Sequence, residues 1–293
     1  MKKFIDTNLK NKSKTVENRI QFYKYEGLKS LPLPTEIEIS ESGTCNRKCS
    51  FCPRSSPGFI DKKEFISDDL HLKLCKELNK LNYSGTLRYS GFVEPMIDKN
   101  IFNLISMARK YVPNCNIEMV TNGDPLNLSR LKKLFLSGLN KILISVYDGK
   151  EDAIKFESLC DEAKLSQDQY IIRHRYLSED QDFGITLSNR SGLMENAEYK
   201  IESLKSPLKK PCFIPSYTFF LDYQGDVLMC PHDWGKKIIL GNLKKKKLID
   251  IWFSKKFMKI RKMLNNSNRN FQPCNVCDVE GTFMGEKNSS YFE

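Results

Sequence analysis

Three cysteines near the N-terminal third, Cys45, Cys49 and Cys52, stand in a C-x3-C-x2-C pattern. Three thiolates on one short loop can hold three irons of a cubane iron–sulfur cluster and leave the fourth iron without a protein ligand. An open metal position of this kind is what a site needs to bind and activate another molecule. Zinc is the alternative, but it would need a fourth ligand from far along the chain, because the first histidine is His71.

A second group of four cysteines lies in the C-terminal part, where a C-x17-C pair is followed after a long gap by a C-x2-C pair. Four thiolates make a closed tetrahedral set, which suits a zinc ion or a second cubane cluster. The spacing alone does not separate these two metals. The four residues are Cys212, Cys230, Cys274 and Cys277.

The other three of the ten cysteines, Cys75, Cys115 and Cys160, have no cysteine partner nearby and are predicted to be small buried hydrophobic residues. The chain begins without the apolar segment of a signal peptide, so we expect a reducing, cytoplasmic setting. In that setting grouped cysteines indicate metal chemistry and not a disulfide framework.

Composition bounds the function further. The chain of 293 residues is 40% hydrophobic and 28% charged, as in ordinary globular proteins, and no apolar run is long enough to span a membrane. The net charge of +11 comes from lysines spread along the chain, without an aromatic-interleaved RNA-binding motif. The positive charge therefore does not by itself indicate nucleic-acid binding. It would suit a phosphorylated substrate or an acidic electron-transfer protein.

Hydrophobic periodicity predicts strands that alternate with helices, which is typical of βα units with a parallel sheet. Six such units favour an α/β fold of the partial (β/α)6, TIM-like barrel type, because a closed barrel needs eight. The predicted strands are 35–40, 85–90, 116–121, 141–146, 170–176 and a weak 183–187, and the predicted helices are 70–81, 101–111, 128–137 and 154–165.

The pattern changes towards both ends of the chain. Residues 1–34 are polar and are predicted to be an N-terminal extension, and 35–206 form the barrel. Closely spaced prolines then mark a boundary near residue 206. Beyond it, 207–293 is predicted to be a small α+β iron–sulfur domain, with a hairpin of 217–222 and 226–229 and one amphipathic helix over 248–264.

At its first cysteines the sequence resembles the radical S-adenosylmethionine (radical SAM) enzymes, whose signature is C-x3-C-x-aromatic-C. Phe51 stands at the aromatic position, and the segment follows a predicted strand. The resemblance implies that Cys45, Cys49 and Cys52 hold a [4Fe–4S] cluster that binds SAM. It also implies that the enzyme makes a 5′-deoxyadenosyl radical, which abstracts hydrogen from a C–H bond.

Strand ends carry further family features. Gly91 and Glu94 lie in a turn that resembles the Gly-Glu-Pro turn for the amino group of SAM, although Val93 replaces the usual glycine. Thr121 and Asn122 end the third predicted strand, as is common near the cofactor. Ser145 ends the fourth, where a polar residue commonly binds the ribose. Taken singly, each is equally typical of a turn without a ligand.

The fifth predicted strand places Arg173 and Arg175 on one face and His174 on the other. Barrel strands are normally apolar on both faces, so charge here indicates a lined cavity. We predict that the two arginines are catalytic and meet the SAM carboxylate or a substrate hydroxyl; a salt bridge at the barrel rim is the alternative. His174 is equally consistent with a structural role. Residues 188–192 resemble a recurring family turn whose role the sequence does not define.

The C-terminal part resembles the SPASM and twitch extensions of radical SAM enzymes, which carry auxiliary iron–sulfur clusters. The resemblance rests on residues 222–227, 241–243 and 250–252 and on the second cysteine group. A full SPASM domain has three more cysteines after the last pair. This chain has none after Cys277, so we expect one auxiliary cluster and the shortened form of the aminocyclitol dehydrogenase type.

These features predict a radical SAM oxidoreductase with SAM and two [4Fe–4S] clusters as cofactors, acting on a carbohydrate or aminocyclitol alcohol. A flavodoxin- or ferredoxin-type protein would be its reductant, and neither a membrane nor a nucleic acid is an expected partner. The alternatives are a peptide or protein maturase, a redox-neutral sugar epimerase, and a zinc-binding protein that interacts with RNA. Residues 1–34 are too short for the usual peptide-recognition domain, which disfavours the maturase.

Overall fold

A continuous eight-stranded sheet forms the centre of the molecule, in the order β12-β11-β10-β3-β6-β7-β8-β9. The computed structural model describes residues 7–27, 29–178, 181, 184, 187–195 and 200–292. Five neighbouring strands pair in parallel and carry the predicted βα order. They are β3 (Glu36–Ser40), β6 (Thr86–Tyr89), β7 (Asn116–Thr121), β8 (Lys141–Val146) and β9 (Tyr170–His174).

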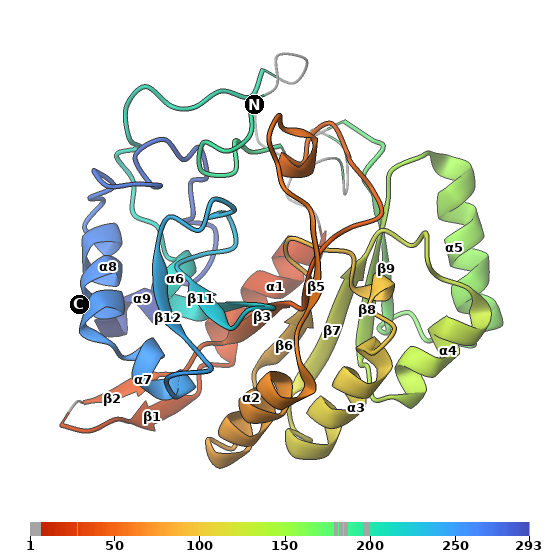
Figure 1. The fold of residues 1–293 in the computed structure, drawn as a ribbon, viewed down its shortest axis with the longest axis horizontal. Coiled ribbons are helices and arrows are strands. Elements are labelled where there is room, and N and C mark those ends of the chain that lie inside the picture. Colours follow the sequence, from red (N-terminus) through yellow and green to blue (C-terminus); the bar gives the residue numbers. More distant parts are fainter. Residues whose placement is uncertain are drawn as a thin grey trace.

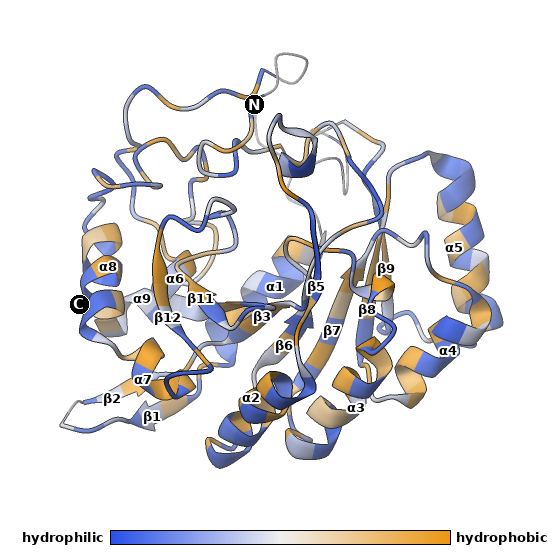
Figure 2. Ribbon diagram, in the orientation of Figure 1, coloured by the Kyte–Doolittle hydropathy of each residue, from blue (hydrophilic) through white to orange (hydrophobic). Residues whose placement is uncertain are grey.

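Four helices cover the outer face of these strands, as Figure 1 shows. Each turns an apolar stripe inwards and a polar face to solvent (Figure 2). In the first of them, Leu74 and Leu78 are fully buried, and Ser67 caps the N-terminus by accepting a hydrogen bond from the Leu70 amide at 3.3 Å. The helices are α2 (Asp68–Lys80), α3 (Ile101–Tyr111), α4 (Leu128–Leu136) and α5 (Lys150–Glu162).

The C-terminal hairpin extends the same sheet. β10 (Thr218–Asp222) pairs in parallel with β3, and β11 (Asp226–Leu228) and β12 (Ile239–Asn242) follow antiparallel. The predicted hairpin is confirmed, but it is not a separate sheet. The predicted boundary near residue 206 therefore divides the sequence without dividing the sheet.

The predicted single helix over 248–264 is wrong, because two helices, α7 (Leu248–Trp252) and α8 (Lys255–Asn265), occupy this segment. Ser254 interrupts the helix, since its hydroxyl caps α8 by accepting from the Phe257 amide at 3.3 Å. The fully buried Arg261 then donates to the carbonyl of Trp252 at 2.7 Å, which satisfies the end of α7. The remaining C-terminal elements are α6 (Ile214–Tyr217), α9 (Glu286–Ser289) and the 3-10 turn η3 (Ser290–Phe292).

The N-terminal segment is more structured than its polar composition suggested. It contains helix α1 (Thr7–Asn18) and the hairpin of β1 (Phe22–Lys24) with β2 (Ser30–Pro32). The weak sixth strand predicted over 183–187 lies largely outside the described residues. Short elements complete the fold: β4 (Ser42–Gly43), β5 (Lys62–Phe65), η1 (Pro53–Ser55) and η2 (Pro95–Ile97). Within the part of the chain that the structure describes, no helix has the length and apolarity needed to cross a membrane.

Candidate active site and cysteine groups

The first cysteine group lies beside a cavity of about 170 Å³ at the carboxyl ends of the parallel strands. Cys45, Cys49 and Cys52 are half-buried and all three line this cavity. Their loop follows β3 and β4 and is tightened by a hydrogen bond from the Cys52 amide to the Cys49 carbonyl at 2.9 Å. The carboxyl ends of barrel strands are where active sites of such folds are built.

Burial raises the pKa of all three thiols, and that of Cys49 rises to about 11. Neighbouring thiols add to the shift at Cys49, since they cannot all ionise without a compensating cation. An iron–sulfur cluster would provide that compensation. The donor set therefore fits a cluster held by three thiolates with one open position towards the cavity.

Two arginines hold the cysteine loop in place, and the sequence did not single them out. Arg47 pairs with Asp124 and Asp148, which follow β7 and β8, at 2.5 Å each, and its guanidinium lies 5.7 Å from the Tyr147 ring centroid. Arg54 is buried, donates to the carbonyl of Phe92 and forms an ion pair with Asp61. The only signal in the sequence was the presence of arginines within and just after the cysteine pattern.

Glu94 organises the turn after β6. Its carboxylate accepts hydrogen bonds from the Thr121 hydroxyl at 2.7 Å, the Asn122 amide at 2.6 Å and the Met96 amide at 3.0 Å. Burial nevertheless raises the pKa of Glu94 to about 7. Gly91 has φ +97°, and a Cβ there would meet Phe220 at 2.9 Å. Gly91, Glu94, Thr121 and Asn122 thus all line one cavity, and their binding of SAM stays a prediction.

Phe51 and Ser145 line the same cavity. The Phe51 ring packs against Tyr147, with centroids 5.4 Å apart, and Tyr147 also lines the cavity. Burial raises the pKa of Tyr147 to about 12, so its hydroxyl stays protonated at neutral pH. Tyr147 is a third residue that the sequence did not single out; it lies one position past the end of β8, in the loop where such functional residues collect.

The two predicted catalytic arginines lie behind this wall and are not among the residues that line the cavity. Arg173 reaches the Ser145 hydroxyl at 3.4 Å, and buried Arg175 donates to the carbonyl of Gly184. His174 points to the other face, with its ring nitrogen 3.1 Å from the Tyr176 hydroxyl. The catalytic role of the arginines stays a prediction.

The second cysteine group lines a separate, smaller cavity of about 20 Å³. Burial, and secondarily the other three thiols, raises the pKa of Cys230 well above its ordinary value. Gly281 leaves room for this group, because a Cβ at its φ of +72° would lie 2.3 Å from the Cys212 sulfur. All four, Cys212, Cys230, Cys274 and Cys277, line the cavity.

The turn 188–192 joins the two cavities. Arg190 lines the first cavity, and its guanidinium lies 3.5 Å from a ring nitrogen of His232, two residues beyond Cys230. The next residue, Ser191, lines the second cavity. Fully buried Asn189 anchors the turn by donating to the carbonyl of Val276, between the last two cysteines, at 2.6 Å. The sequence of this turn resembles the family pattern, but no local pattern indicates that the turn contacts both cysteine groups.

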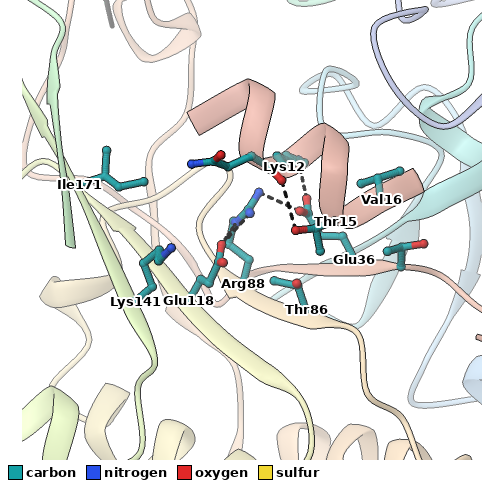
Figure 3. Close-up of a pocket in the computed structure, with 11 residues that line it drawn as sticks. Lys12, Thr15, Val16, Glu36, Thr86, Arg88, Glu118, Lys141 and Ile171 are labelled. Atoms are coloured by element: carbon teal, nitrogen blue, oxygen red, sulfur yellow. Dashed lines mark hydrogen bonds and ion pairs between the residues drawn. The ribbon is translucent and has the colours of Figure 1, made fainter. Parts of the chain in front are cut away.

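A charged network lies towards the amino ends of the parallel strands, and Figure 3 shows its side chains. Lys12 of α1 pairs with Glu36 at 2.7 Å, and Arg88 pairs with Glu36 at 2.8 Å and Glu118 at 2.6 Å, beside a cavity of about 60 Å³. Glu38, one layer above, makes no ion pair among the described residues and accepts a hydrogen bond from the Ser90 hydroxyl at 2.7 Å. Burial, and then Glu36, raises its pKa.

Two family models match the chain. The model of the radical SAM superfamily matches residues 39–186, and that of the SPASM iron–sulfur cluster-binding domain matches residues 212–278. The S-adenosyl-L-methionine-dependent 2-deoxy-scyllo-inosamine dehydrogenase of Niallia circulans is 28% identical over 233 residues, which are 80% of this chain and 88% of that protein. The probable GTP 3',8-cyclase of Thermococcus kodakarensis is 26% identical over 41% of this chain and 38% of its own length.

Solved structures agree with these matches. The crystal structure of BtrN in complex with AdoMet and 2-DOIA has a TM-score of 0.72 and 27% identity, covering 87% of this chain and 98% of that chain. Native anSMEcpe with bound AdoMet, at a TM-score of 0.53 and 15% identity over 88% of this chain and 96% of that chain, shares the fold. Because the superfamily model matches slightly more than half of the 293 residues, the chain belongs to the radical SAM superfamily and carries a SPASM-type domain towards its C-terminus.

Proposed function

We propose that the protein is a radical SAM dehydrogenase that oxidises an alcohol group of an aminocyclitol or a related cyclic polyol. The observation that carries this proposal is the turn 188–192, since Arg190 lines the first cavity and Ser191 lines the second. A substrate radical formed in the first cavity would lie close to the second cysteine group. That proximity is what a net two-electron oxidation needs, because the second electron must leave the substrate.

The chain's own residues bind and orient the cofactors. When bound, SAM and the first cluster supply a 5′-deoxyadenosyl radical that abstracts hydrogen, and the auxiliary cluster supplies an acceptor for the remaining electron. Cys45, Cys49 and Cys52 are proposed to hold the first cluster. Glu94 is proposed to receive the SAM ammonium, for which its buried carboxylate, fixed by three hydrogen bonds, is preorganised. Ser145 is proposed to meet the ribose.

The substrate class follows from the relative and from charge. The Niallia circulans relative is named for an inosamine, an amino-substituted cyclitol. Lys12 and Arg88 form their ion pairs with Glu36 and Glu118. Glu38 therefore has no ion pair among the described residues. Ser90 both lines the cavity and binds Glu38. Burial favours the neutral form of Glu38, and an ammonium group nearby would favour its ionised form, so the proposal includes a substrate that carries an amino group.

The other predicted activities have less support. A zinc-binding RNA protein does not agree with the two family matches. A peptide maturase has no specific observation in its favour, since structural relatives with bound peptide share only the fold. A redox-neutral epimerase stays the second candidate, because it would use the same first cavity without needing the second cysteine group as an acceptor. The proposal includes a flavodoxin- or ferredoxin-type reductant and, given ten free cysteines, a cytoplasmic location.

The test is anaerobic turnover of the reconstituted protein with SAM, dithionite and 2-deoxy-scyllo-inosamine. We expect 5′-deoxyadenosine and a ketone product in a one-to-one ratio, measured by mass spectrometry. In deuterated solvent, the protein could instead form deoxyadenosine without oxidised product and incorporate deuterium into the recovered substrate. That outcome would indicate an epimerase and not a dehydrogenase. If no cyclic polyol is oxidised and none incorporates deuterium, the proposed substrate class is wrong.

A further inference from the structure

Trp234 is the one large apolar surface that the auxiliary-cysteine region contributes to the first cavity among the described residues. It lies four positions after Cys230, in the loop between β11 and β12, and it lines the cavity while remaining half-buried. Neither the cysteine pattern nor the strand-end motifs assigned it a role. Its position connects the loop that carries Cys230 with the cavity proposed to bind SAM.

The loop around Trp234 is held firmly. The fully buried carboxylate of Asp233 accepts hydrogen bonds from the Lys237 amide at 2.9 Å and the Ile238 amide at 2.8 Å. The Trp234 amide donates to the His232 carbonyl at 2.9 Å. A side chain on such a loop is presented to the cavity in a defined place, which is what a binding surface requires.

The indole is also supported from behind. Its ring centroid lies 4.3 Å from that of Phe92 and 6.2 Å from that of Phe59. Phe92 belongs to the turn that contains Gly91 and Glu94, so the indole rests directly on the turn proposed to hold SAM. These aromatic contacts fix the tilt of the indole plane.

The other residues that line the cavity include the polar Ser90, Asn122, Ser145 and Arg190 beside the aromatic Phe51, Phe92 and Tyr147. A cyclic polyol has complementary surfaces, because its ring faces present C–H groups while its edge carries hydroxyl and amino groups. An ammonium group over an indole face is attracted further by the ring quadrupole. A cavity that combines aromatic side chains with several polar groups is therefore a surface that orients a polyol ring.

We propose that the ring of the cyclic polyol substrate stacks on Trp234, which makes this residue a determinant of substrate binding and orientation. The inference rests on the proposed function and adds to it the side chain that recognises the substrate ring. A substrate stacked in this way lies between Glu94 on one side and the Cys230 loop on the other. Both the hydrogen to be removed and the route for the second electron would then be placed by one contact.

The experiment uses the fluorescence of the reconstituted protein, which has two tryptophans. Trp252 is fully buried and donates to the Pro32 carbonyl at 2.9 Å, so it is shielded from any ligand. Titration with 2-deoxy-scyllo-inosamine, glucosamine and myo-inositol in the presence of SAM should change the emission of wild-type protein with at least one of them. Trp234→Phe, which keeps a ring, should abolish the signal change and keep the affinity measured by calorimetry within about threefold.

Trp234→Leu is the decisive variant. It should weaken binding of the same polyol by about tenfold or more, which corresponds to about 1.4 kcal/mol, while iron content, SAM affinity and circular dichroism remain those of Trp234→Phe. Equal polyol affinity in the Leu and Phe variants, or no emission change with any of the three polyols, would overturn the inference. A polyol that binds through Trp234 but is not oxidised would refute the proposed dehydrogenase and leave the stacking role standing.

Discussion

Cys45, Cys49 and Cys52 come from one loop of eight residues, whereas Cys212, Cys230, Cys274 and Cys277 come from three separate segments. The first three thiols are half-buried beside a polar cavity of about 170 Å³. Of the other four, three are buried, and all four line a cavity of about 20 Å³. A short loop with three thiols leaves room for a ligand, while four thiols gathered by the tertiary fold leave none.

This difference indicates a division of labour. The open group lies among polar strand ends that can bind a charged cofactor. The closed group has no comparable space, which suits a centre that only transfers electrons or stabilises the fold. Arg190, Ser191 and Trp234 lie where the two regions meet. The following experiments test whether the two groups are as different in action as they are in construction.

The largest effect is expected for Cys49→Ala. Loss of one of three ligands should remove the first cluster and abolish SAM cleavage, because the open group has no spare thiol among the described residues. Iron should fall from about eight to about four atoms per chain. Deoxyadenosine formation is measured by chromatography, with Cys75→Ala as the matched control, since Cys75 is buried on α2 outside both groups. SAM cleavage retained by Cys49→Ala would contradict the assignment of the open group.

The double variant Cys274→Ala/Cys277→Ala should have the opposite signature. It removes two ligands from the closed group and leaves the open group intact, so deoxyadenosine should still form while ketone product falls about 100-fold or more. Iron should again fall to about four atoms per chain. Circular dichroism must match the wild type, because the closed group also ties separate segments together. Product formed at the normal ratio to deoxyadenosine would show that the closed group is not the electron acceptor.

Arg190→Gln probes the junction between the groups. Removing a half-buried guanidinium that lines the first cavity should lower kcat/KM by about 100-fold, or about 3 kcal/mol, without loss of iron. Arg173→Gln is the comparison variant, and about tenfold is expected, because Arg173 reaches the cavity only through Ser145. A larger effect at Arg173 than at Arg190 would instead support a catalytic role for Arg173 of β9.

The smallest effect is expected for His71, which lies on α2, away from both cysteine groups. It concerns the pH dependence of the free energy of unfolding. His71 is fully buried, its Nε2 lies 2.8 Å from the Tyr89 hydroxyl, and burial lowers its pKa to about 4. Because the folded-state pKa lies below the unfolded value, His71 stabilises the fold above about pH 6.5, and this contribution of up to about 3 kcal/mol is lost as pH falls towards 4. Urea unfolding at pH 7 and pH 4.5 should show a smaller pH dependence for His71→Gln than for the wild type.

Local patterns in the sequence predicted much of the molecule. The βα order, the strands over 116–121 and 141–146, and the hairpin after residue 217 follow from periodicities that the structure confirms. The family assignment from Cys45, Cys49, Cys52 and Phe51 is also confirmed. Two predictions from the sequence differ from the structure because of side-chain contacts. The cap by Ser254 divides one predicted helix into two. The ion pair of Lys12 with Glu36 joins the polar N-terminal segment to the barrel.

The sequence by itself determined the two cysteine groups and the strand-end residues, because metal-ligand spacing and strand alternation are properties of neighbouring residues. It could not determine that β10 pairs with β3, since pairing between residues about 180 positions apart leaves no local pattern. Only the tertiary structure therefore placed Arg190 and Trp234 on the wall of the first cavity and set Arg173 behind Ser145. The chemistry available to the chain is set by residue type, but which residues can act together is set by contacts between segments that are distant in sequence.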